Sequence, residues 1–163
     1  MNSEPREIIS GPSEPSPCPP SGAGSFRKSK ILVIDDEPVN AELLETILAD
    51  SEYQNVKAIT DSRIALELCR TFEPDLVLLD LMMPFVDGFA ILDALGSKPP
   101  WGSLPVMVLT ADENEETRVR ALNAGANDFI LKPFDLAEVL RRIERLLALR
   151  QQRVQCDSHG TST

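Results

Sequence analysis

Histidine is almost absent from this chain of 163 residues, which holds only His159, near the C-terminus. This scarcity excludes a histidine-centred catalytic triad, a histidine-rich metal site and a phosphohistidine relay within the chain. The three cysteines, Cys18, Cys69 and Cys156, have neither metal-binding nor redox spacing. We therefore expect a reduced, cytoplasmic protein.

Other features that define common functions are missing as well. The chain contains neither of the glycine motifs G-x-x-x-x-G-K-[ST] and G-x-G-x-x-G, so nothing indicates that it binds a nucleotide by itself. Its formal net charge of -10 argues against nucleic-acid binding. No apolar run approaches the roughly 20 residues of a membrane span, and no apolar stretch near the N-terminus indicates a signal peptide. We expect no membrane association.

The composition is that of a globular protein, with 42% apolar and 26% charged residues. Residues 1–27 are rich in proline, serine and glycine, which predicts a disordered leader. Residues 28–149 alternate between strand and helix patterns and predict a single domain. Residues 150–163 are predicted to extend the last helix and then to form a disordered polar tail from Cys156.

The continuous run Ile31–Ile34 is typical of a strand buried on both faces. In all, five short runs predict strands. They are Lys30–Ile34, Val56–Thr60, Asp75–Leu79, Val106–Leu109 and Phe129–Leu131. Helices are predicted between and after these runs: from Pro38 to Ala49, after Asp61 with Ile64, Leu66, Leu68 and Phe72, after Asp87-Gly88, over Glu115–Ala124 up to Gly125, and after Asp135. Five such units predict an α/β fold with a single doubly wound, five-stranded parallel sheet and five helices.

Polar side chains follow or close these strands at widely separated positions: Asp35-Asp36, Asp80, Thr110 and Lys132. In an open parallel sheet, ligands bind at the carboxyl ends of the strands, so we expect these side chains to share one edge. Two adjacent carboxylates need a counter-charge, and Mg²⁺ prefers oxygen ligands. A carboxylate such as Asp80 can attack phosphorus and form an acyl phosphate. The sequence therefore predicts a site for Mg²⁺ and a phosphoryl group.

Each of these residues alone has an ordinary structural explanation. Asp35 and Asp36 suit a helix cap, Asp80 suits a turn, Thr110 suits a strand and Lys132 suits a solvated surface. The prediction of a phosphoryl site therefore depends on all of them falling at strand ends in this order.

Four segments resemble the receiver domain of two-component response regulators: Ile31–Asn40, Asp75–Gly88, Val106–Ala111 and Ala124–Phe134. The resemblance covers about Lys28 to Leu149. It implies a flavodoxin-like sheet with the strand order 2-1-3-4-5.

The resemblance also implies roles for single residues. Asp80 corresponds to the phosphoacceptor, and Lys132 to the lysine that pairs with the phosphoryl group. Asp35, Asp36 and Asp80 correspond to the metal-binding acids, with the backbone carbonyl of Met82 as a further Mg²⁺ ligand.

The remaining implied roles concern switching and lifetime. Thr110 corresponds to the switch hydroxyl, and Phe129 to the switch aromatic, a position often occupied by tyrosine in the family. Met82 and Asp112 correspond to the positions that tune how long the phosphoryl group persists. Because Met82 cannot transfer a proton, we expect slow to moderate self-dephosphorylation.

The implied function is that of a response regulator, which catalyses only its own phosphoryl transfer and self-dephosphorylation. A histidine kinase or histidine phosphotransfer protein would donate the phosphoryl group, and the last two helices and last strand would present a changed surface. The expected partners downstream are an effector protein or a missing effector domain, since the chain is either a stand-alone receiver or a fragment of a longer regulator. A phosphorylation-dependent homodimer, with ion pairs between Asp128 and arginines of the last helix across the dimer, is a further hypothesis.

Three alternatives compete with this interpretation. A phosphatase of the haloacid-dehalogenase type would need an acid two residues after its nucleophile, where this chain has Met82. A nucleotide-binding flavodoxin-like module would need a phosphate loop after the first strand. A degenerate receiver that works only as a protein-interaction scaffold would not need the phosphorylation residues, all of which are present. The loop around Trp101 has no functional interpretation.

Overall fold

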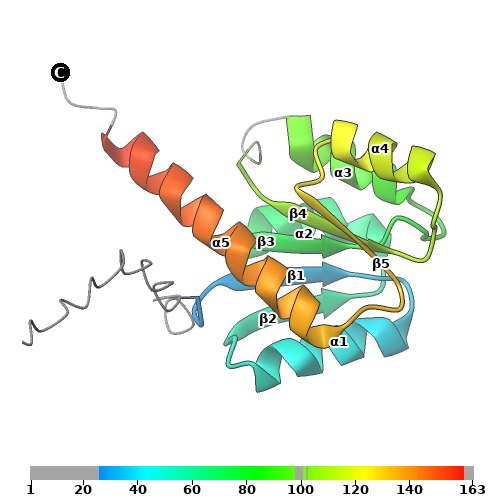
Figure 1. Cartoon of the computed structure of the whole chain (residues 1–163), viewed down its shortest axis with the longest axis horizontal. Helices are drawn as coiled ribbons and strands as arrows, with labels where there is room; N and C mark the ends of the chain where they lie inside the picture. Colours follow the sequence, from blue (N-terminus) through cyan, green and yellow to red (C-terminus); the bar gives the residue numbers. More distant parts are fainter. Residues whose placement is uncertain (1–25, 98–100, 102, 160–163) are drawn as a thin grey trace, which may run out of the picture.

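The computed structural model describes residues 26–97, 101 and 103–159. Five parallel strands form one sheet in the order β2-β1-β3-β4-β5 (Figure 1), which confirms the predicted fold class and strand order. The strands are β1 (Lys30–Ile34), β2 (Asn55–Ile59), β3 (Leu76–Leu79), β4 (Val106–Thr110) and β5 (Asp128–Leu131). The order reverses at β1, which pairs with β2 on one side and β3 on the other.

Five α-helices connect and follow these strands in the described part of the chain. They are α1 (Pro38–Asp50), α2 (Ala65–Phe72), α3 (Gly88–Ser97), α4 (Glu115–Asn123) and α5 (Leu136–His159), with a short 3₁₀ turn, η1 (Ser62–Ile64), before α2. Helices α1 and α5 cover one face of the sheet, and α2, α3 and α4 cover the other (Figure 1). None of these helices has the length and apolar character needed to cross a membrane.

The alternation of side chains along β1 shows why the sheet is buried on both faces. Ile31 and Val33 belong to the core under α1 and α5, whereas Leu32 and Ile34 belong to the core under α2, α3 and α4. Successive side chains of a strand point to opposite faces, so a continuous apolar run supplies both cores. Every residue of the central strands β3 and β4 is buried.

Helix ends agree with the predicted start and stop signals at several positions. Pro38 occupies the first turn of α1, where its missing N–H costs no helical hydrogen bond. The Asp135 carboxylate accepts a hydrogen bond from the Ala137 N–H at 2.8 Å and caps α5. Gly125 follows α4 with a φ of 112°, a backbone conformation that glycine adopts most easily.

The helix predicted after Asp61 differs from the observed one. Asp61 accepts a hydrogen bond from the Arg63 N–H at 3.0 Å, but η1 intervenes before α2 begins at Ala65. Because a 3₁₀ turn has about three residues per turn, its side chains do not continue the buried stripe of the α-helix. Ile64 is 45% exposed, and Ala65 and Cys69 are the buried residues of α2. The predicted Leu66, Leu68 and Phe72 are half-buried and pack against the same core.

Two predicted limits, the end of the leader and the start of the polar tail, differ from the described structure. Phe26, assigned to the leader, is 8% exposed and packs into the core, and the Arg27 carbonyl accepts a hydrogen bond from the Gln54 N–H at 2.8 Å. Helix α5 extends past Leu149, as expected, but it continues to His159 through the start of the predicted tail. The first strong helix breaker after Asp135 is Gly160. The rest of the predicted leader and tail lies outside the described residues.

The predicted loop between α3 and β4 is only partly described. Trp101 is half-buried against the core under α2, α3 and α4, and the Arg70 guanidinium lies 5.5 Å from the centre of its ring. Lys98–Pro100 and Gly102 lie outside the described residues.

Candidate functional site

Two of the predicted carboxylates leave the sheet at neighbouring strand ends. The Asp80 N–H donates to the Ile34 carbonyl at 2.9 Å, and the Asp35 N–H donates to the Ile59 carbonyl at 3.1 Å. Both backbones are therefore held by the hydrogen-bond ladder at the point where their side chains turn into the site. Neighbouring parallel strands explain why residues 45 positions apart in sequence meet here.

The acidic residues form one cluster. Asp35, Asp36 and Asp80 each offer a carboxylate oxygen within 4.8 Å of the others. Asp35 is only 2% exposed and Asp80 only 7% exposed, while Asp36 is half-buried. Such an arrangement of oxygen donors suits a hard divalent cation such as Mg²⁺. The Met82 N–H donates to Asp80 Oδ1 at 3.0 Å, which places the backbone of Met82 beside the cluster.

Lys132 brings a positive charge to this cluster from the end of β5. Its Nζ lies 2.8 Å from Asp35 Oδ2 and 3.1 Å from Asp80 Oδ2, and its side chain is 17% exposed. Its backbone N–H donates to the Thr110 carbonyl at 2.8 Å, and the following peptide bond to Pro133 is cis. The sequence predicted Lys132 at this edge of the sheet, and the structure shows that it pairs with both Asp80 and Asp35.

Protonation in the site reflects the competition between burial and charge. Burial raises the pKa of Asp80 above its ordinary value, although the Met82 N–H and the Lys132 ammonium act in the opposite direction. Burial acts to lower the pKa of Lys132, but hydrogen bonds and charges of Asp35 and Asp80 outweigh it and the pKa is raised. The ammonium form of Lys132 is therefore favoured, whereas burial disfavours the charged form of Asp80.

Thr110 and Asp112 lie on the adjoining strand end and loop. Thr110 is fully buried, and its Oγ1 accepts a hydrogen bond from the Asp112 N–H at 3.3 Å. The Asp112 carboxylate accepts from the Thr117 hydroxyl at 2.6 Å and from the Asn114 N–H at 2.9 Å. The hydrogen bond from Thr117, followed by that from Asn114, lowers the pKa of Asp112. Because both its oxygens accept hydrogen bonds, Asp112 organises the entry to α4.

Gly88 is a site residue that the sequence interpretation missed, since it was assigned only to turn chemistry. A Cβ atom at this position would lie 2.6 Å from Leu81 Cα and 2.7 Å from the Asp80 carbonyl oxygen. Only glycine allows the first turn of α3 to pack so closely on the backbone of the phosphoacceptor candidate. The D-G pair in the sequence was the available signal, but it did not show which backbone the glycine approaches.

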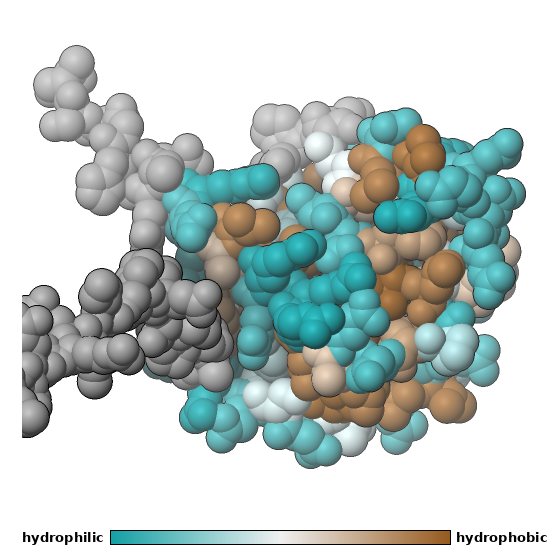
Figure 2. Space-filling model, in the orientation of Figure 1, coloured by the Kyte–Doolittle hydropathy of each residue, from teal (hydrophilic) through white to brown (hydrophobic). Residues whose placement is uncertain are grey.

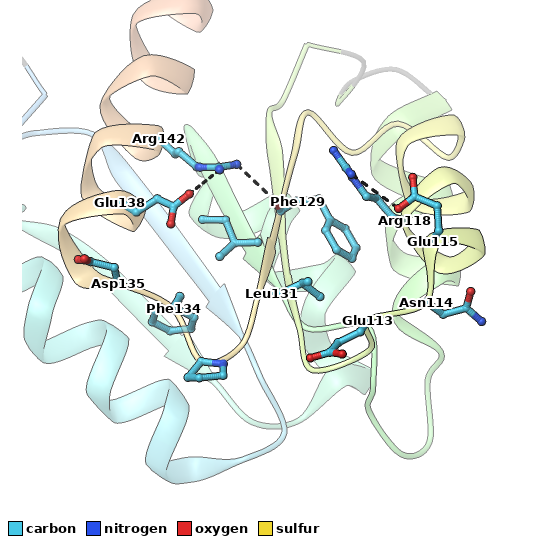
Figure 3. Close-up of a pocket in the computed structure, with 12 residues that line it drawn as sticks. Glu113, Asn114, Glu115, Arg118, Phe129, Leu131, Phe134, Asp135, Glu138 and Arg142 are labelled. Atoms are coloured by element: carbon cyan, nitrogen blue, oxygen red, sulfur yellow. Dashed lines mark hydrogen bonds and ion pairs between the residues drawn. The ribbon is translucent and has the colours of Figure 1, made fainter.

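Phe129 lies within β5, three residues before Lys132, and apart from the acidic cluster. Its half-buried ring lines a hollow of about 330 Å³ between α4, β5 and the start of α5. Figure 3 shows the ring on the α4 side of β5, near Arg118, with Leu131 and Phe134 further along the same hollow. A change of the Phe129 rotamer would require open space of this kind beside the ring.

Asp128 makes its ion pairs within its own chain. It is 8% exposed and contacts Arg142 at 2.6 Å and Arg145 at 3.1 Å. Helix α5 carries both arginines over the start of β5, so Asp128 has two arginine partners within its own chain. The ion pairs across a dimer stay a prediction. Arg142 also contacts Glu138 one turn earlier in α5 at 2.5 Å (Figure 3).

The face formed by α4, β5 and α5 carries apolar side chains beside this charged cluster. Figure 2 shows hydrophobic surface along β5 and on α4, next to hydrophilic surface on α5. Val119 and Leu122 of α4 are 48% and 43% exposed, and Leu131 of β5 is 40% exposed. This mixed surface borders the hollow that holds Phe129.

The strand order and an acidic edge closed by a lysine define a class, the flavodoxin-like receivers of signalling pathways. A family model described as the response regulator receiver domain matches residues 31–144. The chain belongs to this family of two-component signalling proteins.

Response regulator MprA of Mycolicibacterium vanbaalenii is 42% identical over 118 residues, which cover 72% of this chain and 50% of MprA. The chain thus spans about half or less of the length of the curated relatives that it matches. The receiver domain of a signal transduction histidine kinase from Syntrophus aciditrophicus has 34% identity and a TM-score of 0.68, covering 74% of this chain and 90% of its own. The receiver domain of sensor histidine kinase PA1611 from Pseudomonas aeruginosa has 29% identity and a TM-score of 0.67, covering 74% of this chain and 98% of its own; its structure has a magnesium ion coordinated in the active site cleft.

Proposed function

We propose that Asp80 accepts a phosphoryl group from the phosphohistidine of a histidine kinase or histidine phosphotransfer protein. One observation carries this proposal: the Asp80 carboxylate, only 7% exposed, contacts Lys132 and clusters with the acids Asp35 and Asp36 at the ends of parallel strands. A buried nucleophile beside both a cation and metal-ligating oxygens suits phosphoryl transfer.

The transfer forms one bond to phosphorus and breaks another. An Asp80 carboxylate oxygen attacks phosphorus, the P–N bond to the donor imidazole breaks, and its electron pair returns to the imidazole nitrogen. Charge is then spread over the phosphoryl oxygens. Lys132, with its Nζ 3.1 Å from Asp80 Oδ2, is already placed to neutralise part of that charge.

Mg²⁺ fits the residues present, because Asp35, Asp36 and Asp80 supply oxygen ligands and the backbone of Met82 adjoins them. When bound, the ion supplies positive charge against the carboxylates and the phosphoryl oxygens. The magnesium ion in the related PA1611 receiver supports this assignment.

Switching would begin at Thr110. Its hydroxyl, fully buried at the end of β4, would donate a hydrogen bond to a phosphoryl oxygen and draw the following loop toward Asp80. Phe129 would then turn into space vacated near β4, and the surface of α4, β5 and α5 would change. The phosphoryl group must interact more favourably with the active state than with the inactive one in order to shift the population toward the active state. An effector protein, an effector domain of a longer regulator or a second copy of the chain would recognise that surface.

Intact-mass spectrometry after incubation with acetyl phosphate and Mg²⁺ tests the phosphoacceptor. We expect the wild type to gain one phosphoryl group and Asp80→Asn to gain none, because an amide oxygen is a poor nucleophile. Omitting Mg²⁺ should prevent most of the gain. A wild-type protein that gains nothing would instead support the phosphorylation-independent scaffold.

The lifetime of the phosphoryl group should depend on Met82. This side chain is 62% exposed next to Asp80 and has no group that can orient or deprotonate water. We expect Met82→Asn to accelerate self-dephosphorylation by about tenfold, the scale of one well-placed hydrogen bond. Loss of the added phosphoryl mass over time measures the rate, and an unchanged rate would remove Met82 from this role.

A further inference from the structure

Phe85 is an exposed aromatic side chain on the loop that begins at Asp80. It is 85% exposed, the largest value among the exposed large hydrophobic residues in the described part of the chain. An isolated apolar side chain at a surface is common, but a phenylalanine this exposed gains almost nothing from burial. Its position five residues after the candidate phosphoacceptor invites a functional explanation.

The backbone presents this ring in an unusual way. Phe85 has a φ of 72°, and the Val86 N–H donates to the Pro84 carbonyl at 3.0 Å, so Phe85 is the central residue of a three-residue γ-turn. The form of this turn with positive φ is rare and strained. For a bulky side chain such a φ is a marked outlier, which persists when the surrounding structure holds it.

The neighbouring turn η1 contacts the loop and carries further exposed side chains. The Ser62 hydroxyl donates to the Pro84 carbonyl at 3.3 Å, and the Arg63 guanidinium lies 5.2 Å from the centre of the Phe85 ring. Ile64 of η1 and Met82 of the Asp80 loop are also exposed. We call the set of Arg63, Ile64, Met82 and Phe85 the Phe85 patch.

We propose that the Phe85 patch is the docking surface for the protein that carries the phosphohistidine, and that Phe85 helps to select that protein. This inference rests on the proposed phosphoacceptor function. A small donor such as acetyl phosphate needs only the acidic edge, whereas a protein donor must cover the loop around a carboxylate that is only 7% exposed. The Phe85 patch lies on that loop.

Charge indicates the chemistry of the partner. The chain has a formal net charge of -10, and three carboxylates meet at the site, so a negatively charged phosphodonor is repelled at longer range. Arg63 supplies a cation beside the Phe85 ring; it pairs with Asp61 at 2.9 Å, and its side chain remains 65% exposed. The matching donor surface has apolar side chains next to its phosphohistidine, to receive the ring, and a carboxylate facing Arg63.

Phe85→Gly separates docking from folding, because glycine adopts positive φ without strain and removes only the ring. The donors are purified transmitter and phosphotransfer domains from the source organism, each phosphorylated on histidine with radiolabelled ATP. The one that phosphorylates the wild type fastest is then used with the variants. We expect transfer to Phe85→Gly to be at least about tenfold slower, as for loss of an aromatic hot spot. Phosphorylation by acetyl phosphate should stay within about twofold of the wild type.

Two further variants make the result specific. Phe85→Tyr keeps the ring and should retain rapid transfer, whereas Leu149→Ala removes exposed apolar surface from α5 and should change neither reaction. Equal transfer to the wild type and Phe85→Gly would overturn the proposal, and so would slowing of both reactions together. Failure of every protein donor while acetyl phosphate labels the wild type would also overturn it and leave the phosphoacceptor function intact. Failure of acetyl phosphate itself counts against the proposed function.

Discussion

Replacing Lys132 with methionine is expected to lower the free energy of unfolding by about 3 kcal/mol without divalent metal, the scale found when one partner of a buried ion pair is removed. The ammonium contacts Asp35 at 2.8 Å and Asp80 at 3.1 Å, and both carboxylates are almost fully buried. Methionine has a similar length, so the change removes charge and hydrogen bonds rather than volume. The same variant should accept the phosphoryl group about 100-fold more slowly, because it lacks a cation beside the phosphoryl oxygens.

Urea unfolding with EDTA and with Mg²⁺ tests the electrostatic explanation of this loss. A divalent cation replaces part of the missing charge, so Mg²⁺ should stabilise Lys132→Met more than it stabilises the wild type. Lys28→Met, which changes an exposed lysine, is the matched control and should alter stability little. A loss of stability that Mg²⁺ does not reduce would show that Lys132 acts through packing instead of charge.

Gly88→Ala is expected to destabilise the domain by about 2–3 kcal/mol, the upper range for overpacking, and to slow phosphorylation of Asp80. The added methyl group would meet backbone atoms at 2.6 and 2.7 Å, and backbone cannot move aside as the end of a side chain can. Either α3 or the Asp80 loop must shift. A shift of the loop would strain the hydrogen bond from the Asp80 N–H to the Ile34 carbonyl, now 2.9 Å long, and would move the nucleophile relative to Lys132 and the acids.

The matched control for this variant is Ala90→Gly, an exposed position in the first turn of α3. It should cost only about 1 kcal/mol through helix propensity and leave the rate of phosphorylation by acetyl phosphate unchanged. Chemical denaturation and intact-mass kinetics measure both effects. If Gly88→Ala kept the wild-type stability and the wild-type rate of phosphorylation, the close approach of α3 to Asp80 would not matter for either property.

Much of the site could be predicted from the sequence, because topology alone brings strand ends together. Once continuous apolar runs mark parallel strands, a polar residue directly after each run must lie at one edge of the sheet. Asp35, Asp80 and Lys132 meet for this reason. The helix ends were predictable for a similar reason, since Pro38 and Asp135 act through local hydrogen bonding.

What could not be predicted depends on contacts between distant segments. The sequence showed that Gly88 favours a turn, but its approach to the Asp80 carbonyl depends on how α3 packs on the loop. The sequence around Phe26 resembles the rest of the leader, and only the tertiary structure shows that Phe26 packs into the core. The sequence also does not show that Arg142 and Arg145 lie over β5 and pair with Asp128 within one chain.

The length of α5 has a mechanical consequence. It spans 24 residues, about 36 Å at a rise of 1.5 Å per residue. It is fixed to the domain by Asp128 in its first half and by the Arg150–Asp75 contact at 3.3 Å. A tilt of about 10° at that contact would move the end of the helix at His159 by roughly 2 Å. A small rearrangement at the far edge of β5 would therefore become a larger displacement of whatever binds or follows the end of α5.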